Sequence, residues 1–395
     1  MSQSQKKYYY IKSRPYQEMA WWKTHDKNPF VNYLEYETVR KWSRFKINKD
    51  FNKKIEEIYS IHQIIKDLNE YHFYNSKEKQ YYTRNTPTNT FRLRKRSGGY
   101  REITVFSEEY KQMHSMLMDI YEELFPVFPE STSAYIKGKS QLATVKKHED
   151  ARVHLSIDLA SFYPSIKTDN LARILKSLAI IVANIDEINI DRLAEISTFG
   201  GCLAQGSSIS PILSNIFSIP LDYEMYAFVR NTNITYTRYA DDISLSSPNV
   251  IALPKKRELS AFVIEFQKGL NRLYGGELKI NAEKTKLQFE GQIKVLGICI
   301  NHKTLDGNPQ LSVGKTRKEE YSKELFDLLC DIADDNINGR LLDYQIVRGK
   351  IEYLKQFEPA WFSRQEVKLR TTFNFQGDVW KYILRKITPP ELVTE

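Results

Sequence analysis

Two adjacent aspartates, Asp241 and Asp242, stand between two short stretches in which apolar and polar residues alternate. Alternation with a period of two is typical of strands, so the segment ITYTRYADDISLSS predicts a β-hairpin with the carboxylates at its tip. Neighbouring acids at a tight turn repel one another and are normally solvated. They become useful where Mg²⁺ must be held, because this hard cation prefers carboxylate oxygens. Taken alone, the motif leaves two interpretations: a solvated surface turn, or half of a metal site.

A third acid occurs earlier in the chain, in the segment HLSIDLASFYPSI. Apolar residues alternate from Val153 to Leu159, which predicts a strand whose opposite face carries Asp158. An acid in the middle of a strand is unfavourable unless it binds something. The alternative is that Asp158 caps the turn that follows. Two strands that each supply an acid are what a two-metal phosphoryl-transfer site requires.

These segments, in this order, resemble the conserved blocks of reverse transcriptases. HLSIDLASFYPSI, AQGSSISPILSN and RYADD are similar to the third, fourth and fifth blocks. RLRKRSGGYREI is similar to the first, and SAYIKGKSQLATVKKH to the second together with the extra region of retron-type enzymes. LKINAEKTKL, VLGICIN and IVRGKIEYLKQFEP resemble the later palm block, the primer grip and the thumb, so the resemblance spans about residues 90–360.

The resemblance implies an α+β fold of the right-hand polymerase type, in which an antiparallel palm sheet is covered by helices. A helical thumb follows the palm, and a mostly helical, basic and aromatic extension precedes the fingers. The expected parts are the extension over 1–90, fingers over 91–150 and 166–204, palm over 151–165 and 205–300, and thumb over 301–395.

The implied activity is RNA-directed DNA synthesis from dNTPs by two-metal catalysis. By the resemblance, Asp158 and Asp241 are ligands of two Mg²⁺ ions, for which Mn²⁺ can substitute. The Leu159 carbonyl adds a backbone oxygen, and Asp242 assists as a more distant acid.

Further residues match the family's substrate contacts. Tyr163 matches the steric gate, where a ring collides with a 2′-OH and favours dNTPs; the alternative is an aromatic that packs under the turn. Lys284 matches a lysine near the leaving pyrophosphate, or is a solvated turn residue. Arg101 is the first candidate for binding the incoming triphosphate, and Arg94 or Lys95 is the second. Gln205 and Gly206 are expected beside the template base and the nucleotide sugar.

The charge distribution agrees with a nucleic-acid partner. The net charge is +9, and the first 150 residues hold 27 Lys and Arg against 19 Asp and Glu. A basic N-terminal third beside a carboxylate centre suits a phosphate-rich template. The segment YYYIKSRPYQEMAWW adds aromatics that stack on bases or pack on the core. The three scattered cysteines exclude a zinc or disulfide framework, and the absence of long apolar runs predicts no membrane association and a cytoplasmic protein.

The extra region departs from the retron pattern, because Thr144 and Val145 stand where Asn-Ala is typical, although His148 is retained. We therefore favour a neighbouring bacterial class, the defence-associated or abortive-infection-like reverse transcriptases, which copy a structured non-coding RNA into a DNA product and work with an effector protein against phage. The alternatives are a true retron enzyme that makes RNA-linked single-stranded DNA, a polymerase that is template-independent or primed on a tyrosine such as Tyr8–Tyr10 or Tyr81, and an inactive RNA-binding scaffold.

Overall fold

Contacts within the chain divide it into two units. Unit 1 comprises Met1–Ser140 and His154–Leu287, and unit 2 comprises Gln141–Val153 and Gln288–Glu395. The basic and aromatic N-terminal segment, with Tyr8–Tyr10, lies outside the described residues. The computed structural model describes residues 51–75, 80–85, 88–95, 98–182, 185–291, 293–302, 309–333 and 343–387.

A four-stranded sheet with the order β6-β7-β5-β8 carries the acid motifs. Strands β6 and β7 form an antiparallel hairpin in which Tyr239 lies opposite Asp242, so the predicted hairpin with carboxylates at its tip is confirmed. The neighbour of β7 is the strand that contains Asp158. The bounds are β5 (Val153–Ala160), β6 (Thr235–Tyr239), β7 (Asp242–Ser247) and β8 (Lys279–Phe289).

Strand β5 is buried on both faces. Leu155 and Ile157, on the apolar face, are fully buried, and on the other face His154 is also fully buried and Asp158 is only 8% exposed. The alternation of apolar and polar residues along β5 therefore does not mark one buried and one solvated face. Both faces are buried, and they differ only in polarity. A carboxylate placed this deep requires a compensating charge or ligand.

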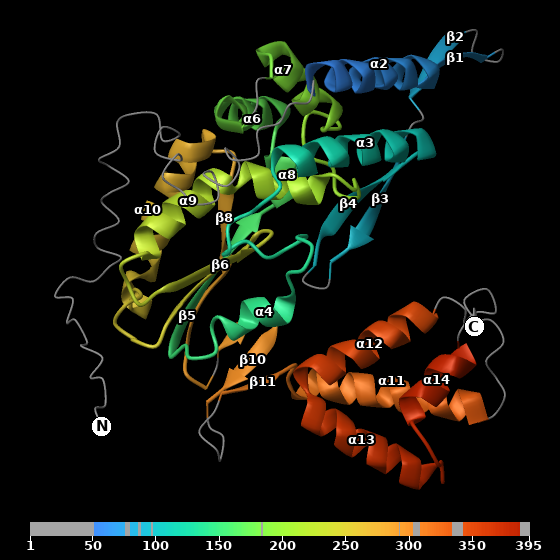
Figure 1. The fold of residues 1–395 in the computed structure, drawn as a ribbon, viewed down its shortest axis with the longest axis vertical. Coiled ribbons are helices and arrows are strands. Elements are labelled where there is room, and N and C mark those ends of the chain that lie inside the picture. Colours follow the sequence, from blue (N-terminus) through green and yellow to red (C-terminus); the bar gives the residue numbers. More distant parts are fainter. Residues whose placement is uncertain are drawn as a thin grey trace. The chain divides into compact units, whose positions relative to one another are not determined.

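Helices cover the sheet in unit 1, with α8, α9 and α10 drawn along it in Figure 1. Pro211 lies in the first turn of α8, and α10 ends at Gly275 with a left-handed φ of 65°. Phe217 stacks on Tyr274 with ring centroids 4.7 Å apart, which joins α8 to α10 in the core. The helices of this unit are α2 (Phe51–Asn69), α3 (Glu108–Leu124), α5 (Phe162–Ser165), α6 (Thr168–Val182), α7 (Glu187–Ile196), α8 (Ser210–Phe217), α9 (Ile219–Val229) and α10 (Leu259–Tyr274), which the short 3₁₀ turn Lys256–Glu258 precedes.

Two further hairpins belong to unit 1. Strands β3 (Thr88–Arg94) and β4 (Tyr100–Phe106) pair around Gly98 and Gly99. The helical interpretation of the first 90 residues is wrong after α2, because β1 (Glu70–Asn75) and β2 (Gln80–Asn85) form an antiparallel pair. Tyrosines, threonine and phenylalanine in these stretches favour extended backbone, which explains the correction.

The Gln205–Gly206 segment is fixed against strand β4. The Thr104 N–H donates to the Gln205 carbonyl at 2.8 Å. Gly206 has φ +108°, and a Cβ at this position would lie 2.2 Å from the Thr104 carbonyl oxygen. Glycine is therefore required both by the backbone conformation and by the close approach of β4.

Unit 2 is built mainly of helices around its own apolar core. Leu325 and Leu328 of α11 and Ile351 and Leu354 of α12 are buried in that core. Buried Glu358, between α12 and α13, accepts a hydrogen bond from the Val313 N–H at 2.8 Å and so attaches the end of β11 to the helices. The elements are α4 (Gln141–Lys146), β9 (Lys294–Val295), β10 (Ile298–Asn301), β11 (Gln310–Ser312), α11 (Lys315–Ala333), α12 (Asp343–Phe357), α13 (Pro359–Thr372) and α14 (Val379–Ile387), with sheet order β11-β10-β9.

Within the part of the chain that the structure describes, every helix is too short or too polar to cross a membrane.

Replacing Gly206 tests the contact with β4. We expect Gly206→Ala to lower the free energy of unfolding by about 2–4 kcal/mol, because it adds a steric clash to the strain of a positive φ. The matched control is Gly201→Ala, since Gly201 also has a positive φ, +77°, but open space around its Cβ position. Urea unfolding of both variants measures the difference, and equal destabilisation would show that the close approach to Thr104 has no energetic consequence.

Candidate active site

The turn between β6 and β7 places Asp241 beside strand β5. Ala240, the first turn residue, has a left-handed φ of 55°, a conformation that costs a non-glycine residue about 1–2 kcal/mol. The Leu159 N–H donates to the Asp241 carbonyl at 3.2 Å. Because Leu159 directly follows Asp158, this single bond aligns the two acid motifs that the sequence shows far apart.

The three acids share one electrostatic environment. Burial raises the pKa of Asp241, with a further contribution from Asp158, and Lys284 and Arg101 oppose the shift. Burial also raises the pKa of Asp242 to about 6, with added repulsion from Asp241 and Asp158. Mutual repulsion at partly buried carboxylates favours any cation that binds among them.

Lys284 supplies part of that positive charge. Its Nζ lies 3.2 Å from Oδ1 of Asp158 and donates a hydrogen bond to it. The lysine side chain is 53% exposed, whereas that of Asp158 is 12% exposed. The structure thus brings Lys284 to the acids, rather than leaving it as a solvated turn residue.

Tyr163 follows β5 in a tight turn. Ser161 has a left-handed φ of 48° and precedes the short helix α5, which contains Tyr163. Burial raises the pKa of Tyr163, with further contributions from Tyr135 and the nearby charge of Asp241, while Ser214 opposes the shift. The half-buried ring therefore lies near the acids.

The β3–β4 hairpin brings Arg101 into electrostatic range of Asp241. The charge of Arg101, on β4, opposes the rise in the pKa of Asp241 that burial causes. The same strand holds the Gln205–Gly206 segment through Thr104. Lys95 is exposed at the end of the hairpin, where its N–H donates to the Gly99 carbonyl at 2.9 Å.

Sequence reasoning missed the buried ion pair behind the acids. Arg238 and Asp222 are both 0% exposed, and the guanidinium binds the carboxylate through two hydrogen bonds, Nε to Oδ1 at 2.8 Å and Nη2 to Oδ2 at 2.7 Å. Burial alone would lower the pKa of Arg238, but Asp222 raises it above its usual value, so the guanidinium stays charged. The signal was present in the sequence, because Arg238 occupies an inward position of an alternating strand, where a cation needs an acid partner.

The acids form an open site rather than a closed cage. Among the described residues, no group of three His, Cys, Asp or Glu side chains is arranged to hold a metal ion by itself. Mg²⁺ is commonly bound by one or two carboxylates together with substrate phosphates and water. Asp158 and Asp241 can supply the carboxylate ligands of a Mg²⁺ ion bound in this way. The pKa of Asp241 is raised, and Lys284 already binds one oxygen of Asp158, so both carboxylates lie where positive charge is favoured.

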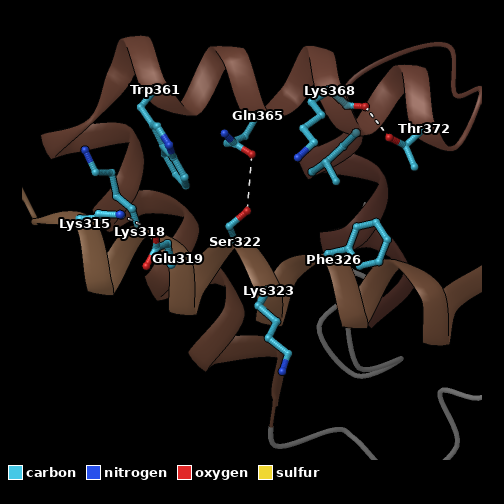
Figure 2. A pocket seen from close by; sticks show the side chains of 11 residues that line it. Lys315, Lys318, Glu319, Ser322, Lys323, Phe326, Trp361, Gln365, Lys368 and Thr372 are labelled. Carbon is cyan, nitrogen blue, oxygen red and sulfur yellow. Dashed lines mark hydrogen bonds and ion pairs between the residues drawn. The ribbon is translucent and has the colours of Figure 1, made fainter.

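Unit 2 contains a basic groove between α11 and α13. Figure 2 shows Ser322 and Gln365 facing one another across it, with Trp361 and Phe326 on either side. The Ser322 Oγ donates to Gln365 Oε1 at 3.4 Å. Four lysines and one glutamate contribute to the lining, so its charge is positive: Lys315, Lys318, Lys323, Lys368 and Glu319.

Two lysines of the groove carry unneutralised charge. Lys315 pairs with Glu319 at 3.7 Å, and Lys318 pairs with Glu358 at 3.4 Å. Within the described residues no acid lies within ion-pair distance of Lys323 or Lys368, and both side chains are exposed.

Comparison with known proteins gives one family. The family model described as reverse transcriptase (RNA-dependent DNA polymerase) matches residues 93–300, and enzymes of this family use divalent metal ions. The retron Ec83 reverse transcriptase of Escherichia coli is 26% identical over 291 residues, which cover 70% of this chain and 85% of that enzyme.

Two further matches are more distant or shorter. The retron Mx65 reverse transcriptase of Myxococcus xanthus is 27% identical over 226 residues, 54% of this chain and 51% of that enzyme, so the match spans about half of its length. Among solved structures, telomerase from Candida albicans in complex with a fragment of telomeric RNA aligns with a TM-score of 0.41 and 13% identity, over 76% of this chain and 62% of that one.

The matched residues include both acid motifs, the Gln205–Gly206 segment and Lys284. The chain therefore belongs to the reverse transcriptase family and is an RNA-directed DNA polymerase, with an RNA template and a DNA product, that is similar to bacterial retron enzymes.

Proposed function

We propose that the chain synthesises DNA from dNTPs at Asp158 and Asp241, with two Mg²⁺ ions, for which Mn²⁺ can substitute. The observation that carries this proposal is the bond from the Leu159 N–H to the Asp241 carbonyl, which aligns the two acid-bearing strands. The Leu159 carbonyl would add a backbone ligand, and Asp242 would assist as the more distant acid. Divalent ions held there supply charge that activates the attacking hydroxyl and offsets the charge developing in the in-line displacement.

The surrounding cations would bind the phosphates. Arg101 already acts electrostatically on Asp241 from strand β4, and we assign it to the incoming triphosphate, with Lys95 as a second, more exposed contact. Lys284 lies on Asp158, where its ammonium group would offset the charge that grows on the departing pyrophosphate. These cations act on groups that become more negative during the reaction, so they favour the transition state.

Tyr163 would act as the sugar gate. Its ring follows Asp158 in the turn after β5 and is partly buried near Tyr135 and Ser214. A ring held in this way cannot easily move aside for a 2′-OH. Gln205 and Gly206 would face the nascent base pair on a backbone that β4 fixes through Thr104.

We keep the boundaries expected from the sequence as the proposed assignment of polymerase parts. The four-stranded sheet lies within the palm ranges, and the helices after β11 lie within the thumb range. The proposed fingers are 91–150 and 166–204, the palm 151–165 and 205–300, and the thumb 301–395.

The biological role that we propose is copying a structured non-coding RNA in bacterial antiphage defence, with an effector protein as a further partner. Similarity to the retron Ec83 and Mx65 enzymes supports this role. A true retron enzyme, which makes RNA-linked single-stranded DNA, is the alternative that the same similarity favours. Sequencing the RNA and DNA that copurify with the protein distinguishes the two, because only a retron yields DNA joined to its RNA.

We further propose that the groove between α11 and α13 contacts single-stranded RNA. Exposed Lys323 and Lys368 suit phosphates, and Trp361 and Phe326 offer rings on which bases stack. Ser322, Gln365 and Thr372 supply hydroxyl and amide groups that can bind sugars and base edges.

Removing the turn acid tests the catalytic assignment. Asp241→Ala should reduce dNTP incorporation by at least about 10³-fold, since it removes a group needed to stabilise the transition state, while the melting temperature changes little. Asp191→Ala, which removes a surface acid that pairs with Lys176, is the control and should keep parental activity. Primer extension on an RNA template measures both, and substantial activity in Asp241→Ala would overturn the assignment.

Truncating the gate tests sugar selection. Tyr163→Ala should raise rNTP incorporation relative to dNTP incorporation by at least about 10-fold, because the ring that excludes the 2′-OH is gone. Tyr163→Phe keeps the ring and should keep the discrimination. Single-nucleotide incorporation with competing dNTP and rNTP gives the ratio, and the gate lies elsewhere if the alanine variant rejects rNTPs as strongly as the parent.

Reversing two groove charges tests the RNA-binding proposal. We expect Lys323→Glu with Lys368→Glu to weaken binding of an oligouridylate about 10-fold or more and to reduce the slope of log affinity against log salt by about 0.7 for each phosphate that the groove no longer neutralises. The control pair Lys355→Glu with Lys381→Glu makes the same change in net charge on exposed lysines that do not line the groove. Fluorescence anisotropy over a salt series provides the measurement. Equal effects of the two pairs would mean that only overall charge matters.

A further inference from the structure

The guanidinium of Arg238 connects the acid turn to the helices behind it. Its Nη1 donates to the Ala240 carbonyl at 3.1 Å and to Asn215 Oδ1, also at 3.1 Å. Nε and Nη2 bind the two oxygens of Asp222 on α9. One fully buried side chain therefore contacts α8, α9 and the turn that carries Asp241.

Asp222 is itself held in place from two other directions. Tyr236 donates to Oδ1 at 2.6 Å and Thr132 donates to Oδ2 at 2.8 Å. The backbone of Arg238 is also fixed, since its N–H donates to the Ser131 carbonyl at 2.9 Å and its carbonyl accepts from the Ser133 N–H at 3.1 Å. These contacts restrict the orientation of the guanidinium.

The two successive carbonyls of the acid turn are bound on different sides. The Ala240 carbonyl accepts from Arg238, and the Asp241 carbonyl accepts from the Leu159 N–H. Ala240 itself has a left-handed φ of 55°. Such a conformation persists only when its surroundings determine it, and strained residues of this kind cluster at functional sites.

We infer that Arg238 is a positioning residue for the polymerase reaction: by holding the Ala240 carbonyl, it sets the direction in which Asp241 presents its carboxylate to the metal ions. The inference rests on the proposed function of Asp241 as a metal ligand. Arg238 touches no substrate and acts only through the turn. Its planar fork is needed because it binds Asp222 with one edge and the turn with another, and the single ammonium group of a lysine cannot reproduce both contacts.

The neighbouring Tyr236 offers a matched control. It lies on the same strand and donates to the same Asp222 oxygen as Arg238 Nε. Tyr236→Phe therefore disturbs the buried acid without removing the contact to the Ala240 carbonyl. If Arg238 contributed to stability alone, Arg238→Lys and Tyr236→Phe would have similar effects on Mn²⁺ binding.

The test compares Arg238→Lys with Tyr236→Phe in the full chain. Binding of Mn²⁺ in the presence of dNTP is followed by the EPR signal of free Mn²⁺, beside the melting temperature and the kcat and KM of primer extension. We expect Arg238→Lys to weaken Mn²⁺ binding about 5-fold or more and to lower kcat about 10- to 100-fold, with KM for dNTP within about 2-fold of the parent. Tyr236→Phe should keep parental Mn²⁺ binding, whatever its loss in melting temperature.

Asn215→Ala provides a second variant in case Arg238→Lys does not fold. It removes the other acceptor of Nη1 and frees the guanidinium to turn, so Mn²⁺ binding should weaken in the same direction by about 2-fold or more. If the folded variants bind Mn²⁺ as the parent does while Asp241→Ala is inactive, the inference about Arg238 is overturned and the proposed function stands. Parental activity in Asp241→Ala would instead overturn the proposed function on which it rests.

Discussion

The buried pair of Arg238 and Asp222 is the constraint on which the acid site depends. Two opposite charges with no solvent exposure are retained only where their geometry and hydrogen bonds offset the desolvation of both. The pair meets this requirement with a two-point contact between the side chains and with further donors from Tyr236 and Thr132. Removing one partner would leave an unpaired charge at a cost of about 3–5 kcal/mol. The pair thereby joins the sheet, two helices and the strained turn into one rigid arrangement.

The site that this arrangement supports concentrates like charge. Burial raises the pKa of Asp241 and Asp242, and repulsion from the neighbouring acids adds to the shift. Lys284 offsets only part of that charge. A site in this condition gains stability when cations bind, because the same repulsion that penalises the free carboxylates strengthens the attraction to a divalent ion. The strain at Ala240 and the repulsion among the acids are thus both consistent with a site organised for its ligands rather than for the free state.

Much of this structure could be predicted from the sequence. The YADD hairpin and the strand of Asp158 have strong local patterns, and the structure confirms them. The β1–β2 pair was missed because one mostly helical extension was expected over residues 1–90, although the strands are rich in tyrosine. The convergence of Asp158 with Asp241 came from resemblance, since no local pattern encodes a contact between distant strands. The partner of Arg238 could not be found in the sequence. Asp222 lies on a helix, and nothing in the sequence around it distinguishes a buried acid from a solvated one.

The central claim is that Asp158 and Asp241 together hold the catalytic metal ions. A crystal of the protein grown with a non-hydrolysable dNTP analogue and Mn²⁺, with anomalous scattering collected at the manganese edge, tests it most directly. We expect two anomalous peaks, each within coordination distance of a carboxylate oxygen of Asp158 or Asp241. Manganese bound elsewhere, or the absence of peaks at these two side chains at saturating Mn²⁺, would contradict it.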